Sequence, residues 1–123
     1  MSNVRIAIAS SDGIVVNRHF GKAEKFYIAE ADTSDYSYKI VEEREVTPVC
    51  KVEGHDDDAL ALAVKNLSDC RYLIVSRIGF RAKDACEAGG LVVYEIPVTF
   101  DRAVEKALKY EEVQKMISES LGL

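Results

Sequence analysis

The chain has 123 residues, of which 48% are hydrophobic and 30% charged, and this composition is typical of one soluble globular domain. No apolar run approaches the roughly 20 residues that cross a bilayer, and the first residues lack a signal-peptide pattern, so we expect a cytoplasmic protein. The net charge of -5 argues against nonspecific nucleic-acid binding. The three cysteines, Cys50, Cys70 and Cys86, lack CxxC spacing, so neither a disulfide framework nor a structural zinc site is indicated.

The first half of the chain predicts three strands. Val4–Ala9 is an apolar run typical of a buried strand. Phe26–Ala31 is apolar on both alternating sets of residues, which suits a strand covered on both faces. Tyr36–Val46 should pair back as a hairpin, and the charge in its second half places it at a sheet edge.

The second half alternates helices with strands. An amphipathic helix is predicted from about Asp57 to Ser68, and a buried parallel strand follows over Arg71–Val75. A second helix covers Phe80–Ala88 and is ended by two glycines, and Leu91–Ile96 is the last strand. The remaining residues, about 101–123, form a helical extension.

Two apolar stripes mark this extension. They consist of Ala103, Val104, Ala107 and Leu108, and of Val113, Met116, Ile117 and Leu121. Because the stripe shifts across Tyr110-Glu111, we expect a kink or two short helices.

The resulting order, β-β-β-α-β-α-β-α, predicts an α/β fold. An early antiparallel hairpin followed by two βα crossovers fits a three-layer sandwich on a mixed five-stranded sheet. Residues 1–123 are expected to form a single domain.

The loop after the first strand carries residues suited to binding. Asp12-Gly13 is a turn dipeptide, because Gly accepts a positive φ at no steric cost. Arg18 is a permanent cation, and His19 can ligate a metal as neutral imidazole. Asp12 and Asn17 are interpreted as loop-shaping residues, with Asn17 placed to orient His19. From the residues alone, capping a turn is the favoured role of His19.

The pattern of this loop resembles the dinitrogenase iron-molybdenum cofactor biosynthesis family, the NifX, NafY and NifB C-terminal-domain group. The matching segments, in chain order, are Asp12-Gly13, Asn17-Arg18-His19-Phe20-Gly21, Arg44 through Pro48 to Cys50, Asp57–Leu60, Asp69-Cys70, Ile78-Gly79 and Ala88–Gly90. The resemblance implies a ribonuclease H-like fold. It also implies binding of an anionic iron-sulfur cluster or molybdenum-containing precursor, with the histidine of the His-Phe-Gly motif, here His19, taking part.

A second set of cations is expected beside this loop. Because parallel strands bring their carboxyl ends to one sheet edge, the turn at Arg77 should lie next to the Arg18-His19 loop. This turn also opens a helix, whose free N–H groups favour an anion. Together the cations would form one local pocket of Arg18, Lys22, Arg77, Arg81 and Lys83. The alternative is that Arg77 and Arg81 are solvated surface charges.

His19 is the first candidate metal ligand, and Cys50 is the second. Cys50 follows Pro48 in a polar loop, where an exposed thiolate could ligate a soft metal or where the cysteine could be incidental. Cys70 and Cys86 are interpreted as small core residues.

The leading hypothesis is a non-catalytic carrier that binds the cluster transiently and delivers it to a partner protein, as a monomer or weak dimer without nucleic acid or membrane. One alternative is a ribonuclease H-like metal-dependent nuclease, although the first strand has no carboxylate to hold its metals. Another is a small-anion or nucleotide-binding regulatory domain at the Arg77 turn, although that turn has a single glycine and no P-loop lysine.

Overall fold

The computed structural model describes residues 3–46, 48 and 56–122, so Cys50 and His55 lie outside the described residues. Its elements are β1 (Asn3–Ala9), a 3-10 turn (Phe20–Lys22), β2 (Lys25–Asp32), β3 (Tyr38–Glu45), α1 (Asp56–Asn66), β4 (Tyr72–Val75), α2 (Phe80–Ala88), β5 (Val92–Glu95) and α3 (Phe100–Ser120). The predicted order of strands and helices is confirmed.

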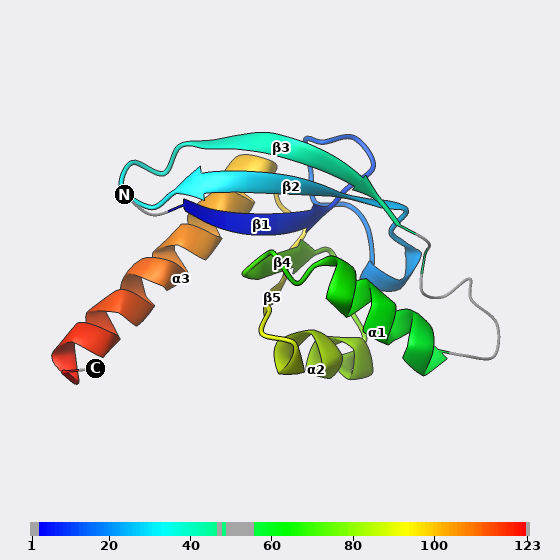
Figure 1. Cartoon of the computed structure of the whole chain (residues 1–123). Coiled ribbons are helices and arrows are strands. Elements are labelled where there is room, and N and C mark those ends of the chain that lie inside the picture. Colours follow the sequence, from blue (N-terminus) through cyan, green and yellow to red (C-terminus); the bar gives the residue numbers. More distant parts are fainter. Residues whose placement is uncertain (1–2, 47, 49–55, 123) are drawn as a thin grey trace.

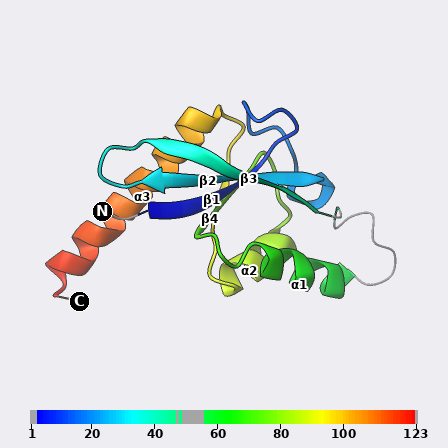
Figure 2. The same cartoon turned by 45° about the horizontal axis from the view of Figure 1, so that its top comes forward.

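The five strands form one mixed sheet in the order β3-β2-β1-β4-β5. β1 pairs with β2, and β2 with β3, in antiparallel fashion, whereas β4 is parallel to both β1 and β5. Helices α1 and α2 lie on one face and α3 on the other (Figures 1 and 2). The predicted α/β fold on a mixed five-stranded sheet is therefore confirmed, with β3 at an edge.

Alternating side chains of the central strands build one core on each face of the sheet. In β4, Leu73 and Val75 join the core beneath α1 and α2, and Tyr72 and Ile74 join the core beneath α3. All four are fully buried, because a parallel strand between two helical layers has no solvent face.

Cys70 and Cys86 belong to the core beneath α1 and α2, as predicted. Burial raises the pKa of the Cys70 thiol to about 12 and that of Cys86 to about 11. Both side chains are packed among apolar residues, which agrees with their interpretation as small core residues.

The expected kink near Tyr110 is wrong, because α3 is one continuous helix of 21 residues. The first apolar stripe is buried against the sheet, whereas the second stays exposed, so no bend is needed to bring it to the core. Thr99 caps the start of the helix through its side-chain oxygen, which accepts from the backbone N–H of Arg102. Within the described residues, no helix is both long and apolar enough to span a membrane.

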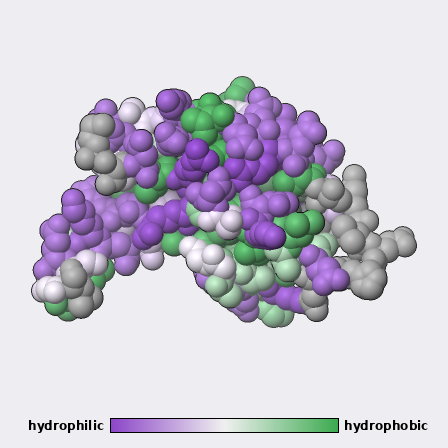
Figure 3. Space-filling view, viewed as in Figure 1, coloured by the Kyte–Doolittle hydropathy of each residue, from purple (hydrophilic) through white to green (hydrophobic). Residues whose placement is uncertain are grey.

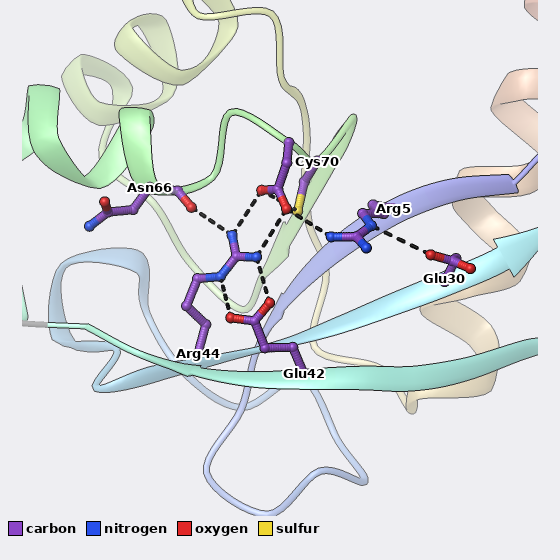
Figure 4. Close-up of polar contacts among 7 residues, drawn as sticks. Arg5, Glu30, Glu42, Arg44, Asn66 and Cys70 are labelled. Carbon is purple, nitrogen blue, oxygen red and sulfur yellow. Dashed lines mark hydrogen bonds and ion pairs between the residues drawn. The ribbon is translucent and has the colours of Figure 1, made fainter.

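A cluster of charged side chains ties the β3 edge to the turn between α1 and β4 (Figure 4). Arg44 donates to Asp69 (2.9 and 3.0 Å), to Glu42 (2.8 Å) and to the carbonyl oxygen of Asn66 at the end of α1 (2.6 Å). Arg5 of β1 donates to the same Asp69 carboxylate (2.9 Å). Arg44, a charged residue of the edge strand β3, thus fastens the end of α1 to the sheet.

This cluster makes stability depend on acid. Hydrogen bonds from Arg44 hold the pKa of Asp69 well below its usual 3.8. The contribution of Asp69 is therefore complete above about pH 4 and is lost as pH falls through the lower, folded-state value. In denaturant unfolding, Asp69→Asn should be less stable than the wild type at neutral pH, and the difference should shrink in acid. A constant difference would contradict this assignment.

Replacing Arg44 by Met should lower the free energy of unfolding by about 1 to 3 kcal/mol at neutral pH, since Asp69 then loses charge-assisted hydrogen bonds. The matched control is Lys25→Met, which removes the more exposed ion pair with Glu43 (3.2 Å). That change should cost below about 1 kcal/mol. Equal losses in the two variants would show that the Arg44 cluster is no stronger than an ordinary surface pair.

Candidate functional site

The loop between β1 and the 3-10 turn is fastened on one side to the segment that enters α3. The Val16 N–H donates to the carbonyl oxygen of Val98 (2.8 Å), and the Phe100 N–H donates to that of Ile14 (3.0 Å). Val15 and Thr99 thereby form an antiparallel bridge. Residues 14–16 of the loop are thus held by the residues that lead into α3.

On its other side the loop runs beside the turn after β4. The Ser76 N–H donates to the carbonyl oxygen of Arg18 (3.0 Å), and the Phe20 N–H donates to that of Arg77 (2.9 Å). His19 and Arg77 form a parallel bridge between these bonds. The prediction that the Arg18-His19 loop and the Arg77 turn meet at one sheet edge is confirmed.

Hydrogen bonds inside the loop fix its shape. Asp12 Oδ1 accepts from the N–H groups of Ile14 (2.9 Å) and Val15 (3.1 Å), and these bonds lower the pKa of Asp12. Asn17 accepts from the Ser11 N–H (2.9 Å) and donates to the Ser11 hydroxyl (3.1 Å). Both residues shape the loop as expected, although the described contacts of Asn17 go to Ser11 and none to His19.

All the backbone N–H groups from residue 11 to residue 16 have partners. Besides the bonds above, the buried Ser10 hydroxyl accepts from the N–H groups of Asp12 (3.2 Å) and Gly13 (3.1 Å). The loop therefore does not present a row of free amides, which is what a phosphate-binding loop uses.

Two buried side chains anchor the stretch that carries the candidate residues. Val16 is fully buried and Phe20 is 2% exposed, with the Phe20 ring 6.2 Å from that of Phe26. The residues between these anchors, Asn17, Arg18 and His19, are all exposed. Two buried side chains thus flank three exposed ones within five residues.

His19, Arg18 and Arg77 keep their side chains available for a ligand. Among the described residues, none of these three side chains makes a hydrogen bond or ion pair, whereas Arg81 in the first turn of α2 has a contact of its own. The N-cap of α2, Gly79, brings no side-chain cap to the helix start. An exposed imidazole and an exposed cation, His19 and Arg77, are therefore backbone neighbours where β1 and β4 end.

The cations do not all share one pocket, which corrects the prediction. Arg18 lines an open hollow of about 410 Å³ together with Ser10, Ser11, Glu24, Lys25, Glu45 and Val46. Neither His19 nor Arg77 lines this hollow. Because neighbouring side chains of an extended segment point to opposite sides, Arg18 turns toward β2 and β3 while His19 stays with Arg77.

Two residues near the Arg77 turn were not identified from the sequence. Glu95 at the end of β5 accepts from the Ile78 N–H (2.7 Å) and so holds the Arg77 turn, a long-range contact that no local pattern signals. Phe80 is 83% exposed at the start of α2. The exposure of Phe80 could have been predicted, because this residue lies on the side of α2 opposite Ala82, Ala85 and Cys86.

Metal-ligand candidates are sparse in the described part of the chain. It contains no group of three or more His, Cys, Asp or Glu side chains arranged to hold a metal ion. Its cysteines, Cys70 and Cys86, are buried, and Cys50 falls outside it. His19 is therefore the exposed imidazole that the described residues offer to a metal such as iron.

Two solved structures are similar in fold to this chain. The apo form of the orange protein from Desulfovibrio gigas aligns with a TM-score of 0.62 at 21% identity, covering 85% of this chain and 87% of that one. A protein described as NifB from Thermotoga aligns with a TM-score of 0.51 at 26% identity, covering 87% of this chain and 88% of that one.

The family model described as "Dinitrogenase iron-molybdenum cofactor" matches residues 2–110, and the chain belongs to this family. The FeMo cofactor biosynthesis protein NifB of Frankia alni is 36% identical over 104 residues, which are 82% of this chain and 20% of that protein. Its counterpart in Chlorobaculum tepidum is 30% identical over 115 residues, 94% of this chain and 26% of that protein. The chain thus spans about a fifth to a quarter of these relatives.

The loop geometry predicts that any side chain at Gly13 is destabilising. Its φ is +77°, and an added Cβ would lie 3.0 Å from the Tyr27 ring. Gly13→Ala should therefore lower the free energy of unfolding by about 1 to 2 kcal/mol, and hydrogen exchange at the amides of residues 14–16 should accelerate.

The control for this substitution is Gly79→Ala. Gly79 has a φ of -71° and no atom within 4 Å of an added Cβ, so its replacement loses only the N-cap preference for Gly over Ala and should cost roughly 0.5 kcal/mol. If the two variants are equally stable, the loop is not held in the conformation described.

Proposed function

We propose that this chain is a non-catalytic carrier that binds an anionic iron-sulfur or molybdenum-containing cluster at the His19 loop and delivers it to a partner protein. The observation that carries the proposal is the bridge between His19 and Arg77, which puts an exposed imidazole beside an exposed cation. Membership in the iron-molybdenum cofactor family supports the same cargo.

The chemistry of these side chains suits such a cargo. Imidazole is a common ligand of iron, and the guanidinium group of Arg77 can donate hydrogen bonds to sulfide or oxide at the cluster surface. Arg81 and the N-terminal end of α2 add positive potential at the same edge. The net charge of -5 for the whole chain opposes binding of a nucleic acid, whereas the cations at this edge attract a small anion locally.

Sparse ligation is what a carrier requires. A cluster held by several thiolates dissociates slowly, whereas one imidazole with cationic contacts can release it to an acceptor with more ligands. Cys50 remains our candidate for a second ligand, because it follows the end of β3 by only a few residues. We also assign the fold to the ribonuclease H-like class, which the strand order β3-β2-β1-β4-β5 supports.

The proposal is tested by anaerobic titration of the apo-protein with tetrathiomolybdate, and separately with iron(II) and sulfide, followed by visible absorption. Saturation near one cluster per chain is expected. His19→Ala should weaken binding at least about tenfold, equivalent to about 1.4 kcal/mol. The matched control is His55→Ala, the other histidine of the chain, which should bind like the wild type.

Two further variants divide the site. Arg77→Ala should weaken binding, and the difference in affinity from the wild type should shrink as the salt concentration rises, because the contribution of Arg77 is electrostatic. Cys50→Ala should weaken binding only if Cys50 is a ligand. If neither probe gives a charge-transfer spectrum, or if His19→Ala binds as tightly as the wild type, the carrier proposal fails at this loop.

A further inference from the structure

The carboxylate of Glu95 reaches from the end of β5 to the turn that follows β4. Its Oε2 accepts from the Ile78 N–H (2.7 Å). Ile78 directly follows Arg77, and Gly79 after it is the N-cap of α2. The contact therefore joins the edge strand of the sheet to the turn that carries Arg77, a candidate cluster-binding residue.

The peptide group between Arg77 and Ile78 is held from both sides. Its carbonyl oxygen accepts from the Phe20 N–H (2.9 Å), and its N–H donates to Glu95. In a trans peptide these two groups lie in one plane and point in opposite directions. Rotation of this plane would break both hydrogen bonds, so the two bonds together fix its orientation.

The backbone of Glu95 is itself firmly placed. Glu95 pairs with Val75 in the parallel ladder between β4 and β5, and the Ile96 N–H donates to the Val75 carbonyl oxygen (2.9 Å). The same ladder thus fixes Glu95 and the strand that leads into the Arg77 turn. From this support, the Glu95 side chain can hold the turn relative to the sheet.

The orientation of the peptide group maintains the bridge between His19 and Arg77. One hydrogen bond of this bridge runs from the Phe20 N–H to the Arg77 carbonyl oxygen. It exists only while that oxygen is directed at Phe20. By holding the opposite side of the same peptide group, Glu95 favours this direction.

Glu95 also brings a negative charge to an edge proposed to bind an anion, and this charge by itself opposes binding. It does not cancel the charge of Arg77 by direct contact, because the Arg77 side chain makes no ion pair among the described residues. Hydrophilic residues predominate over β3 and α3 in Figure 3, so this carboxylate is one of many polar groups on an acidic chain. What distinguishes Glu95 is its hydrogen bond to the turn.

We infer that Glu95 is a positioning residue of the candidate site, which locks the Arg77–Ile78 peptide group and thereby keeps Arg77 beside His19. The consequence for cargo binding rests on the proposed function. The hydrogen bond acts at short range and in a fixed direction, whereas water and salt screen the repulsion between an exposed carboxylate and a bound anion. The net effect of Glu95 on anion binding is therefore favourable, despite its charge.

Two substitutions separate the hydrogen bond of Glu95 from its charge. Glu95→Gln removes the charge but keeps a side-chain oxygen that can accept from the Ile78 N–H, whereas Glu95→Ala removes both. The probe is tetrathiomolybdate, titrated anaerobically into the full chain. Glu95→Gln should bind it as tightly as the wild type or up to about fivefold more tightly, because a repulsive charge is gone. Glu95→Ala should bind at least about threefold more weakly than the wild type.

Amide hydrogen exchange of the ligand-free protein measures the lock directly. In Glu95→Ala the amides of Ile78 and Phe20 should exchange at least about threefold faster than in the wild type, because both make the hydrogen bonds of this peptide group. Glu95→Gln should restore the wild-type rates. The amide of Leu73, within β4, is the internal control and should exchange alike in all three proteins.

Two results would overturn the inference. One is equal affinity of Glu95→Ala and Glu95→Gln for the probe, which would mean that Glu95 acts only through its charge. The other is wild-type exchange at Ile78 and Phe20 in Glu95→Ala, since the peptide group would then be held without this carboxylate. If exchange accelerates as expected but the wild type does not bind the probe, the lock stands and the cluster proposal at His19 fails.

Discussion

The parallel pairing of β1 with β4 is the constraint on which the candidate site depends. Two backbone hydrogen bonds, from Ser76 to Arg18 and from Phe20 to Arg77, continue this pairing beyond the ends of both strands. As a result, a loop that follows β1 in the sequence is held against a turn more than fifty residues later. His19 and Arg77 are neighbours because the sheet makes them so, and no contact between their side chains is needed.

Much of this arrangement could be predicted from local patterns. Apolar runs mark the strands, and the burial of Tyr72–Val75 follows from their position between two helical layers. The charged residues in the second half of β3 predicted its position at the sheet edge. The meeting of His19 and Arg77 also followed, since carboxyl ends of parallel strands share one edge.

The features that were not predicted depend on distant contacts or on geometry. The role of Glu95 requires knowing that β5 ends beside Ile78, which the sequence does not state. The division of the cations follows from the alternation of Arg18 and His19 about the backbone, which becomes visible only once that segment is known to be extended. The expected kink near Tyr110 failed because an apolar stripe was assumed to face the chain's own core.

The closed hydrogen bonding of the loop has a consequence for how this site can change. Because the amides of residues 11–16 are all satisfied within the protein, the groups that this loop leaves exposed and without a hydrogen bond among the described residues are the side chains of Arg18 and His19. Val16 and Phe20 keep the backbone in place whatever those side chains are. Substitutions of Arg18 or His19 can therefore change what the loop offers to a ligand at little cost in folding, whereas Asn17 is constrained because its side chain satisfies the Ser11 N–H.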